Sequence, residues 1–194
     1  MTEDLGKTLS LSKLGGRMRT LRVRLMTTKR IGIVSTAGLV LGFTLGCTAQ
    51  KQITERDRKE AAYLASEAQF AVSIHEWARA EGLLAKAVKV APTGDYWLSL
   101  GAARIRLNNR AGAKDAYQAA AKAYAFDSAR KNAVSEPWLR QAYVLALLGR
   151  QDESRALLAK AAELFPKDGK IRALTDPKGF EKMISSQNFK DMAL

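Results

Sequence analysis

Residues 97–120 decide the fold, and they read WLSLGAARIRLNNRAGAKDAYQAA. Large apolar residues and the small residues Gly101, Ala113 and Ala120 recur at spacings that predict one α-helix folded back on another. The small residues are expected where the two helices cross closely, because a longer side chain would force their axes apart. One such pair cannot bury its own apolar face, so further pairs are expected on both sides.

Two further copies of this pattern flank the central one. The later copy starts at Trp138 and ends at Pro166. The earlier copy is identified through its second helix, from Trp77 to Pro92, whereas its first helix, around 64–72, is degenerate, as terminal repeats commonly are. Both prolines are expected to end their helices, because proline lacks the backbone donor and clashes one turn back.

The central copy resembles the tetratricopeptide repeat (TPR), in which Trp, two residues and Leu-Gly are followed by a second helix with Ala, three residues and an aromatic. The matching residues are Trp97, Leu100, Gly101, Ala113 and Tyr117. The copy departs from the family at Arg104, where an aromatic is usual, and at Ala125, near the place of a closing proline. The alternative is a generic bundle of three helix pairs.

The resemblance implies an all-α fold, a short α-solenoid. Its three helix pairs would occupy 60–175, at about 60–93, 94–134 and 135–168. A capping helix over 176–194, starting at Asp176-Pro177, would place Phe180, Met183 and Ile184 on one face. Such a cap is what a repeat stack requires at its end.

The central copy is longer than the family repeat. Trp97 to Trp138 spans 41 residues, seven more than the family's 34, and residues 119–134 are alanine-rich without proline. The second helix is therefore expected to overrun by about two turns, ~10 Å. The insertion, 121–136, is either a tolerated loop or a projecting contact for a partner.

The first 46 residues predict a leader. Lys29-Arg30 precedes an uncharged, mostly apolar run over 31–46 that ends at Cys47, the plan of a secretory signal peptide. Sixteen residues are marginal for spanning a ~30 Å hydrocarbon core, so cleavage is favoured over a permanent inner-membrane anchor. If Met26 is the true start, residues 1–25 are not translated. Residues 47–59 are expected to form a polar tether.

The junction Thr44-Leu45-Gly46-Cys47 resembles the lipobox of bacterial lipoproteins. It departs from the usual pattern at Thr44, where Leu is expected, and at Leu45, where a small residue is expected. The resemblance implies cleavage before Cys47 and lipidation of its thiol and amine. Thr48, in place of the Asp that marks inner-membrane retention, favours the outer membrane.

The composition restricts the possible chemistry. Cys47 and His75 are the single cysteine and histidine, so an internal disulfide and the usual zinc sets are excluded. His75 is expected in the turn of the first pair, and no nucleophile has a base partner, so we expect no enzyme activity and no cofactor or metal. Gly6-Lys7-Thr8 lacks the rest of a phosphate loop. The three tryptophans hold repeat positions that favour core packing over base stacking.

The net charge of +13 belongs partly to the leader. Residues 47–194 hold 24 basic and 17 acidic residues, an excess of +7 that does not by itself identify a nucleic-acid binder. Such an excess favours weak attraction to anionic surfaces.

By resemblance, the first helix of each pair would line a concave groove that takes an extended or helical peptide. The candidate groove residues are Gln69, Val72, Leu98, Ala102, Ile105, Arg106, Leu139, Tyr143, Ala146 and Leu147. The alternative is that these residues pack against neighbouring helices. The Lys and Asn set with which some family members clamp a C-terminal carboxylate is not present.

The sequence thus predicts a periplasm-facing outer-membrane lipoprotein that acts as a protein–protein interaction adaptor or scaffold in an envelope assembly of the pilus, secretion or envelope-biogenesis type. Its expected partners are a protein or peptide of the cell envelope and, through Cys47, the membrane; no nucleic acid is expected. The alternative is a structural protein that rests on the cell wall or membrane surface through its basic charge rather than through a peptide groove.

Overall fold

A computed structural model describes residues 53–130 and 134–194, and in these ranges the chain is all-α, without a strand. The predictions for the leader 1–46, for Cys47 and for the start of the tether lie outside the described residues. The helices are α1 (Glu55–Ser73), α2 (Trp77–Val90), α3 (Gly94–Arg106), α4 (Arg110–Ser128), α5 (Glu136–Leu147), α6 (Gln151–Leu164), α7 (Gly169–Thr175), α8 (Pro177–Ser185) and α9 (Gln187–Lys190).

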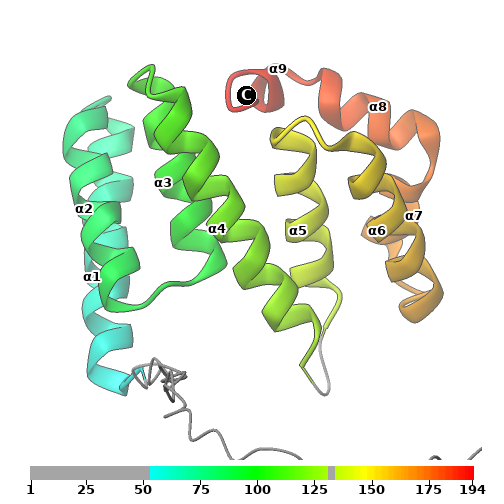
Figure 1. Ribbon diagram of the computed structural model, residues 1–194, viewed down its shortest axis with the longest axis horizontal. Helices are drawn as coiled ribbons and strands as arrows, with labels where there is room; N and C mark the ends of the chain where they lie inside the picture. Colours follow the sequence, from blue (N-terminus) through cyan, green and yellow to red (C-terminus); the bar gives the residue numbers. More distant parts are fainter. Residues whose placement is uncertain (1–52, 131–133) are drawn as a thin grey trace, which may run out of the picture. The chain divides into compact units, whose positions relative to one another are not determined.

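Consecutive helices pack as pairs, and consecutive pairs pack on one another. The helix α1 packs against α2, α3 against α4 and α5 against α6, while α2–α3 and α4–α5 contacts join one pair to the next. Figure 1 shows this succession from α1 and α2 to α7 and α8. The fold is an all-α, solenoid-like stack of helix pairs, as the sequence predicts.

The same turn joins the two helices of every pair. Its central residue has a left-handed backbone, with φ of 63° at His75, 58° at Asn108 and 74° at Gly149. The N–H of the following residue donates to the carbonyl oxygen five residues back, at 2.8 to 2.9 Å in each turn. This is a Schellman arrangement, which satisfies carbonyls that the helix end leaves without partners. His75 therefore lies in the turn where the sequence placed it.

Small residues lie where the paired helices cross. A Cβ atom at Gly101 would stand 2.3 Å from Cε1 of Tyr117, so only glycine fits against this buried ring. Ala113, Ala120 and Ala161 are fully buried in the matching helices. Small side chains let the helix axes approach closely, which is the reason the sequence pattern predicts this fold.

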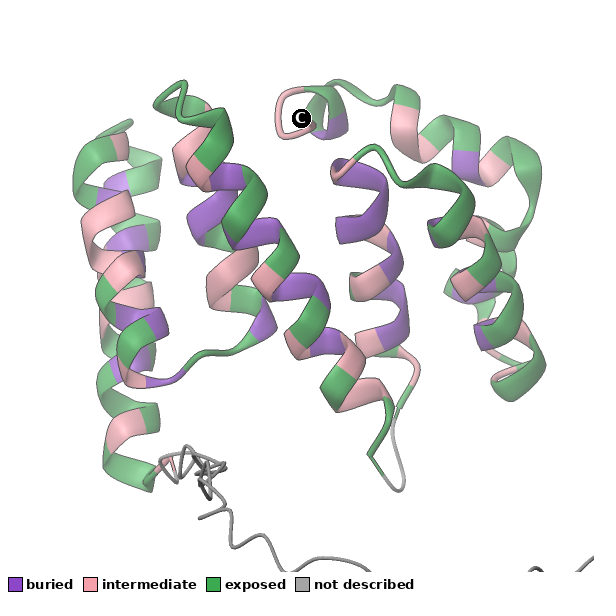
Figure 2. Cartoon of the chain, in the orientation of Figure 1, coloured by how far each residue is buried: buried purple, intermediate pink, exposed green. Residues whose placement is uncertain are grey.

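The core is a row of three apolar clusters that follows the stack, visible as buried bands along the helices in Figure 2. Tyr96 packs against the first and second clusters, and Trp97 against the second and third. Neighbouring pairs thus share their core through two aromatic residues of α3. Such nearest-neighbour contact is typical of repeat stacks.

Two helix boundaries differ from the sequence predictions. The helix α1 begins at Glu55, so the last five residues of the expected tether are helical; Thr54 caps this end, and Asp57 completes a capping box. The helix α4 has 19 residues against 14 in α2 and α6, so its overrun is five residues, about 7.5 Å. The last residue of the insertion, Glu136, is already the first residue of α5.

The C-terminal part folds as three short helices rather than one. Asp176 caps α8 and Pro177 is its first residue, as expected. Phe180 is fully buried, and Met183 and Ile184 pack against the same cluster. In addition, Asp168 caps a separate helix, α7, and α9 follows α8. The predicted cap is therefore found at the expected place, but the sequence predicted one helix where the chain forms three.

Candidate functional site

The first helices of the pairs line two adjoining hollows. The first hollow, about 640 Å³, is bounded by α1, α3 and the first half of α2, and Arg140 and Met192 also line it. The second, about 480 Å³, is bounded by α3, α5, α7 and α8. Leu98 and Arg140 line both. We call the two hollows together the groove. The face that the sequence predicts as a groove is therefore hollowed.

The central wall of the groove is one face of α3. Asp95, Leu98, Ser99, Ala102 and Arg106 recur at helical spacing along it and line the first hollow. The other face of α3 buries Leu100 and Gly101 in the core. The tight Gly101–Tyr117 crossing fixes α3 against α4, so the groove wall is held by the core behind it.

A charged network crosses the groove between the second and third pairs. The Arg140 guanidinium on α5 lies 3.4 Å from the Asp95 carboxylate on α3 and 2.9 Å from Glu136. The Tyr124 hydroxyl donates to the same Asp95 carboxylate. Burial, followed by this hydrogen bond, raises the pKa of Tyr124, so its hydroxyl remains a donor at neutral pH. The groove thus combines an apolar lining with charges held in fixed positions.

The chain's own C-terminal segment, residues 187–194, closes one end of the groove. The Arg106 guanidinium lies 3.1 Å from the Asp191 carboxylate, and the rings of Tyr143 and Phe189 meet edge to face at 5.7 Å. A hydrogen bond from Gln187, followed by that from Arg106, lowers the pKa of Asp191. At neutral pH this carboxylate is therefore ionised and paired.

Two hydrogen bonds that involve backbone groups of the same segment hold it against the helices. The Tyr117 hydroxyl of α4 donates to the Met192 carbonyl at 2.9 Å, and the Leu194 N–H donates to the Leu147 carbonyl at 3.1 Å. Figure 1 shows α9 and the chain end beside the ends of α4 and α5. The segment is thereby tied to the second and third pairs at once.

Seven of the ten predicted groove residues line the hollows. They are Gln69, Val72, Leu98, Ala102, Arg106, Leu139 and Tyr143. Ala146 and Leu147 do not, which corrects the prediction: they are buried in the cluster against which Phe189 and the last residues of the chain pack. Ile105 is partly buried against that cluster.

The remaining lining residues were missed for two reasons. Asp95, Ser99 and Arg140 share helix faces with predicted residues, so the helical period could have found them. Lys170, Leu174 and Met192 come from the C-terminal part, whose return to the third pair has no local pattern in the sequence.

The three tryptophans do not form a stacking platform. Trp138 is buried and Trp97 packs against two clusters, as expected for core residues. Trp77 is half-buried at the edge of the first hollow, with the Arg106 guanidinium 5.6 Å from its ring centroid. Its ring therefore forms part of the groove wall.

Within the described ranges, no group of three or more His, Cys, Asp or Glu side chains is placed to hold a metal ion. In the same ranges, no helix has the length and apolarity needed to cross a bilayer. Comparison of the chain with protein-family models and with curated proteins gives no significant match.

Proposed function

We propose that this protein is a TPR-type lipoprotein facing the periplasm, an adaptor that binds a peptide segment of an envelope partner in its groove. The observation that carries the proposal is the groove itself: a hollowed surface lined by the first helices of successive pairs, with apolar walls and fixed charges.

The lining favours an amphipathic peptide. Leu98, Leu139 and Tyr143 offer apolar contact in the second hollow, and Glu136, Arg140 and Lys170 stand among them. An apolar peptide side chain loses water-exposed surface there, and a charged neighbour on the peptide can pair with the rim. The lining fits a short extended or helical segment better than a small polar metabolite.

Membrane attachment in this proposal depends on Cys47. A processed Cys47 would carry several acyl chains, and each buried CH₂ adds about 0.8 kcal/mol, so the anchor is stable. In Cys47→Ala, the protein is expected to remain unprocessed or to become soluble after cell fractionation. Membrane pelleting of a processed Cys47→Ala protein would contradict lipid anchoring.

Salt dependence separates groove binding from attachment through surface charge. Contacts between exposed charges weaken steeply with ionic strength, whereas apolar groove contacts do not. Pull-down from an envelope extract at low and at high salt should therefore retain the groove partner under both conditions. Loss of all bound protein at high salt would favour the alternative, a structural protein held by its basic surface.

A further inference from the structure

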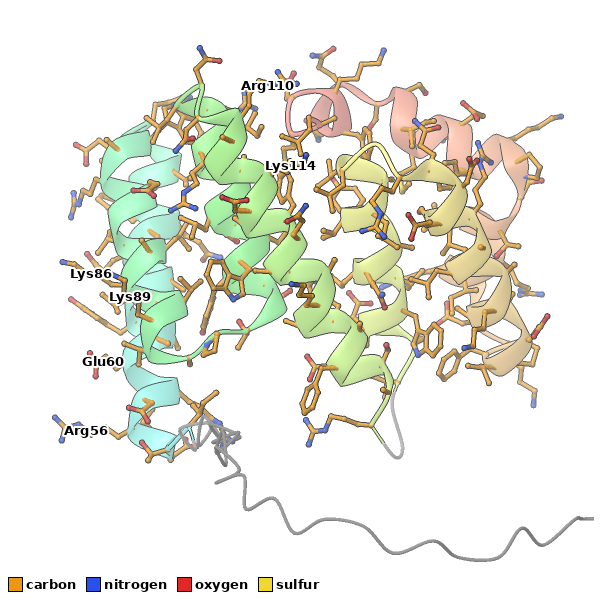
Figure 3. The ribbon with its side chains drawn as sticks, viewed as in Figure 1. Arg56, Glu60, Lys86, Lys89, Arg110 and Lys114 are labelled. Carbon is orange, nitrogen blue, oxygen red and sulfur yellow. The ribbon has the colours of Figure 1, made fainter. Side chains whose placement is uncertain are left out.

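The outward surface of the first helix pair is the end face of the stack, where α1 and α2 have no described helix beside them. Arg56 and Glu60 from α1, and Lys86 and Lys89 from α2, lie along this edge and point away from the other helices (Figure 3).

Helix geometry places a mixed apolar and basic stripe on α1. The helix buries Ala61, Ala68 and Ala71 on one side. The opposite side carries Arg56, Tyr63 and Phe70, at spacings of seven residues. Tyr63 is 65% exposed and Phe70 56% exposed, values unusual for aromatic side chains in a folded domain. The end face is therefore partly aromatic.

Four cations gather at one end of this face. Because α1 and α2 are antiparallel, Ala61 packs beside Ala87 and Ala91, with Ile53 next to them. Lys89 thus lies level with the first turns of α1, and Lys86 about one turn further along it. The four cations are Arg56, Lys59, Lys86 and Lys89. None of them has a carboxylate partner among the described residues.

Some other cations of the stack are held in ion pairs, unlike these four. Arg79, Arg104 and Arg140 each pair with a carboxylate. Glu60 is the acidic residue that Figure 3 labels beside these cations, and Glu55, next to Arg56, pairs with Arg58. The four cations and Glu60 together therefore carry a net charge of about +3. The cations are left available for an external anion.

From this arrangement we propose that the end face docks on the anionic phospholipid headgroups of the membrane that anchors the protein. Lys and Arg are attracted to anionic headgroups, and exposed aromatic rings insert at the boundary between headgroups and acyl chains. A second copy is disfavoured as the occupant, because two such faces would bring like charges together. The proposal rests on the proposed lipid anchor and adds an orientation to it.

The position of the tether agrees with this orientation. Glu55 lies eight residues after Cys47, so the extended chain allows at most about 29 Å between them. An anchored domain must therefore keep the start of α1 close to the bilayer. The cations lie at that end of the first pair, and the groove residues on α5 and α7 lie farther along the stack.

The test uses residues 49–194, because all three core clusters lie within Ile53–Leu194, and because this piece lacks Cys47 and the apolar run. It is mixed with phosphatidylcholine vesicles, neutral or with about a third phosphatidylglycerol. We expect cosedimentation with the anionic vesicles only. The double variant Lys86→Gln/Lys89→Gln should bind on the order of 30-fold more weakly.

A matched control removes the same charge elsewhere. Lys178 and Lys182 are exposed on α8 and without a carboxylate partner in the described ranges, so Lys178→Gln/Lys182→Gln should bind like the unchanged protein. The variant Tyr63→Ser/Phe70→Ser removes apolar contacts, so it should weaken vesicle binding in low salt and in high salt. Its circular dichroism spectrum should be unchanged.

Three outcomes would overturn the proposal: no binding to anionic vesicles, equal loss in the α8 control, or a dimer formed through the end face. None of these outcomes bears on the Cys47→Ala fractionation, which tests the lipid anchor in cells. The vesicle experiment can therefore reject docking of the end face without rejecting the lipid anchor, and the fractionation experiment can reject the lipid anchor without rejecting docking.

Discussion

Gly101 is the residue on which the central crossing depends. A methyl group there would stand 2.3 Å from the Tyr117 ring, and both residues are buried. Gly101→Ala should therefore lower the free energy of unfolding by about 1–3 kcal/mol or more, measured by urea denaturation.

Gly82 supplies the matched control for this substitution. It lies inside α2 with no atom within 4 Å of an added Cβ. Gly82→Ala should raise the free energy of unfolding by about 0.5–1 kcal/mol, because alanine costs less backbone entropy in a helix. Equal effects of the two substitutions would show that the crossing is not tight at Gly101.

The buried tyrosines predict a loss of stability in alkali. Burial raises the pKa of Tyr117, Tyr124 and Tyr143, so the folded chain holds these protons more tightly than the unfolded chain. Stability should be unaffected below the ordinary tyrosine pKa of about 10. Above it, stability should fall by up to about 1.4 kcal/mol per pH unit for each tyrosine that stays protonated in the folded state.

Tyr117→Phe tests this dependence. The variant should lose about 1 kcal/mol at neutral pH with the hydrogen bond to the Met192 carbonyl, and its stability should fall less steeply above about pH 10. Urea denaturation at a series of pH values measures both effects. An unchanged alkaline slope in the variant would contradict burial of a neutral Tyr117 hydroxyl.

At the scale of the element, the C-terminal segment is held mainly by apolar packing. Phe189 is 5% exposed, whereas the Arg106–Asp191 ion pair is partly open to solvent. Phe189→Ala should lower the free energy of unfolding by about 3 kcal/mol, and Asp191→Asn should lower it much less. Urea denaturation compares the two, and a larger effect of Asp191→Asn would reverse this order.

Acid should act on the same segment. The pKa of Asp191 is lower in the folded chain than in the unfolded chain, so its ionised carboxylate stabilises the fold. This stabilisation is complete above the ordinary Asp pKa of about 3.9, and it is lost as the pH falls through the pKa of Asp191 in the folded chain. Nuclear magnetic resonance of the Tyr143 ring should report loosening of the segment in acid. In Asp191→Asn this pH dependence should be absent.

The helices that could be predicted from sequence are those with a local cause. The crossings at Gly101, Ala113 and Ala120 follow from small residues at helical spacing, and Asp176-Pro177 from capping chemistry. The overrun of α4 was predicted from the excess length, and the structure places its end at Ser128. Local pattern was sufficient for the crossings and the cap, whereas the overrun is five residues and not the two turns predicted from the excess length.

Other features depend on contacts between distant residues. The pairing of Arg106 with Asp191, 85 residues later, has no local pattern, and neither has the contact of Tyr117 with Met192. For the same reason Ala146 and Leu147 were predicted as groove residues: their helix face is correct, but the C-terminal part of the chain packs against their cluster. The early start of α1 was missed because its first turn is charged, although Thr54 and Asp57 form a capping box.

At the scale of the whole molecule, the stack carries two separate surfaces, the groove proposed to bind a peptide and the end face proposed to dock on a membrane. The groove lies across the first helices of the pairs, and the end face lies at the first pair alone. Docking of the end face on the membrane would leave the groove accessible to a partner from the envelope. The central claim is that the groove, and not the surface charge, selects this partner.

Site-specific photo-crosslinking in intact cells tests this claim most directly. A photoreactive amino acid replaces Ser99, which is exposed in the first hollow, or Gln118, which is exposed on α4 away from the groove. A discrete crosslinked protein is expected from position 99 and none from position 118, and the product from position 99 should be lost when Ala102→Arg fills the hollow. Equal crosslinking from both positions, or a product that Ala102→Arg leaves unchanged, would contradict the claim.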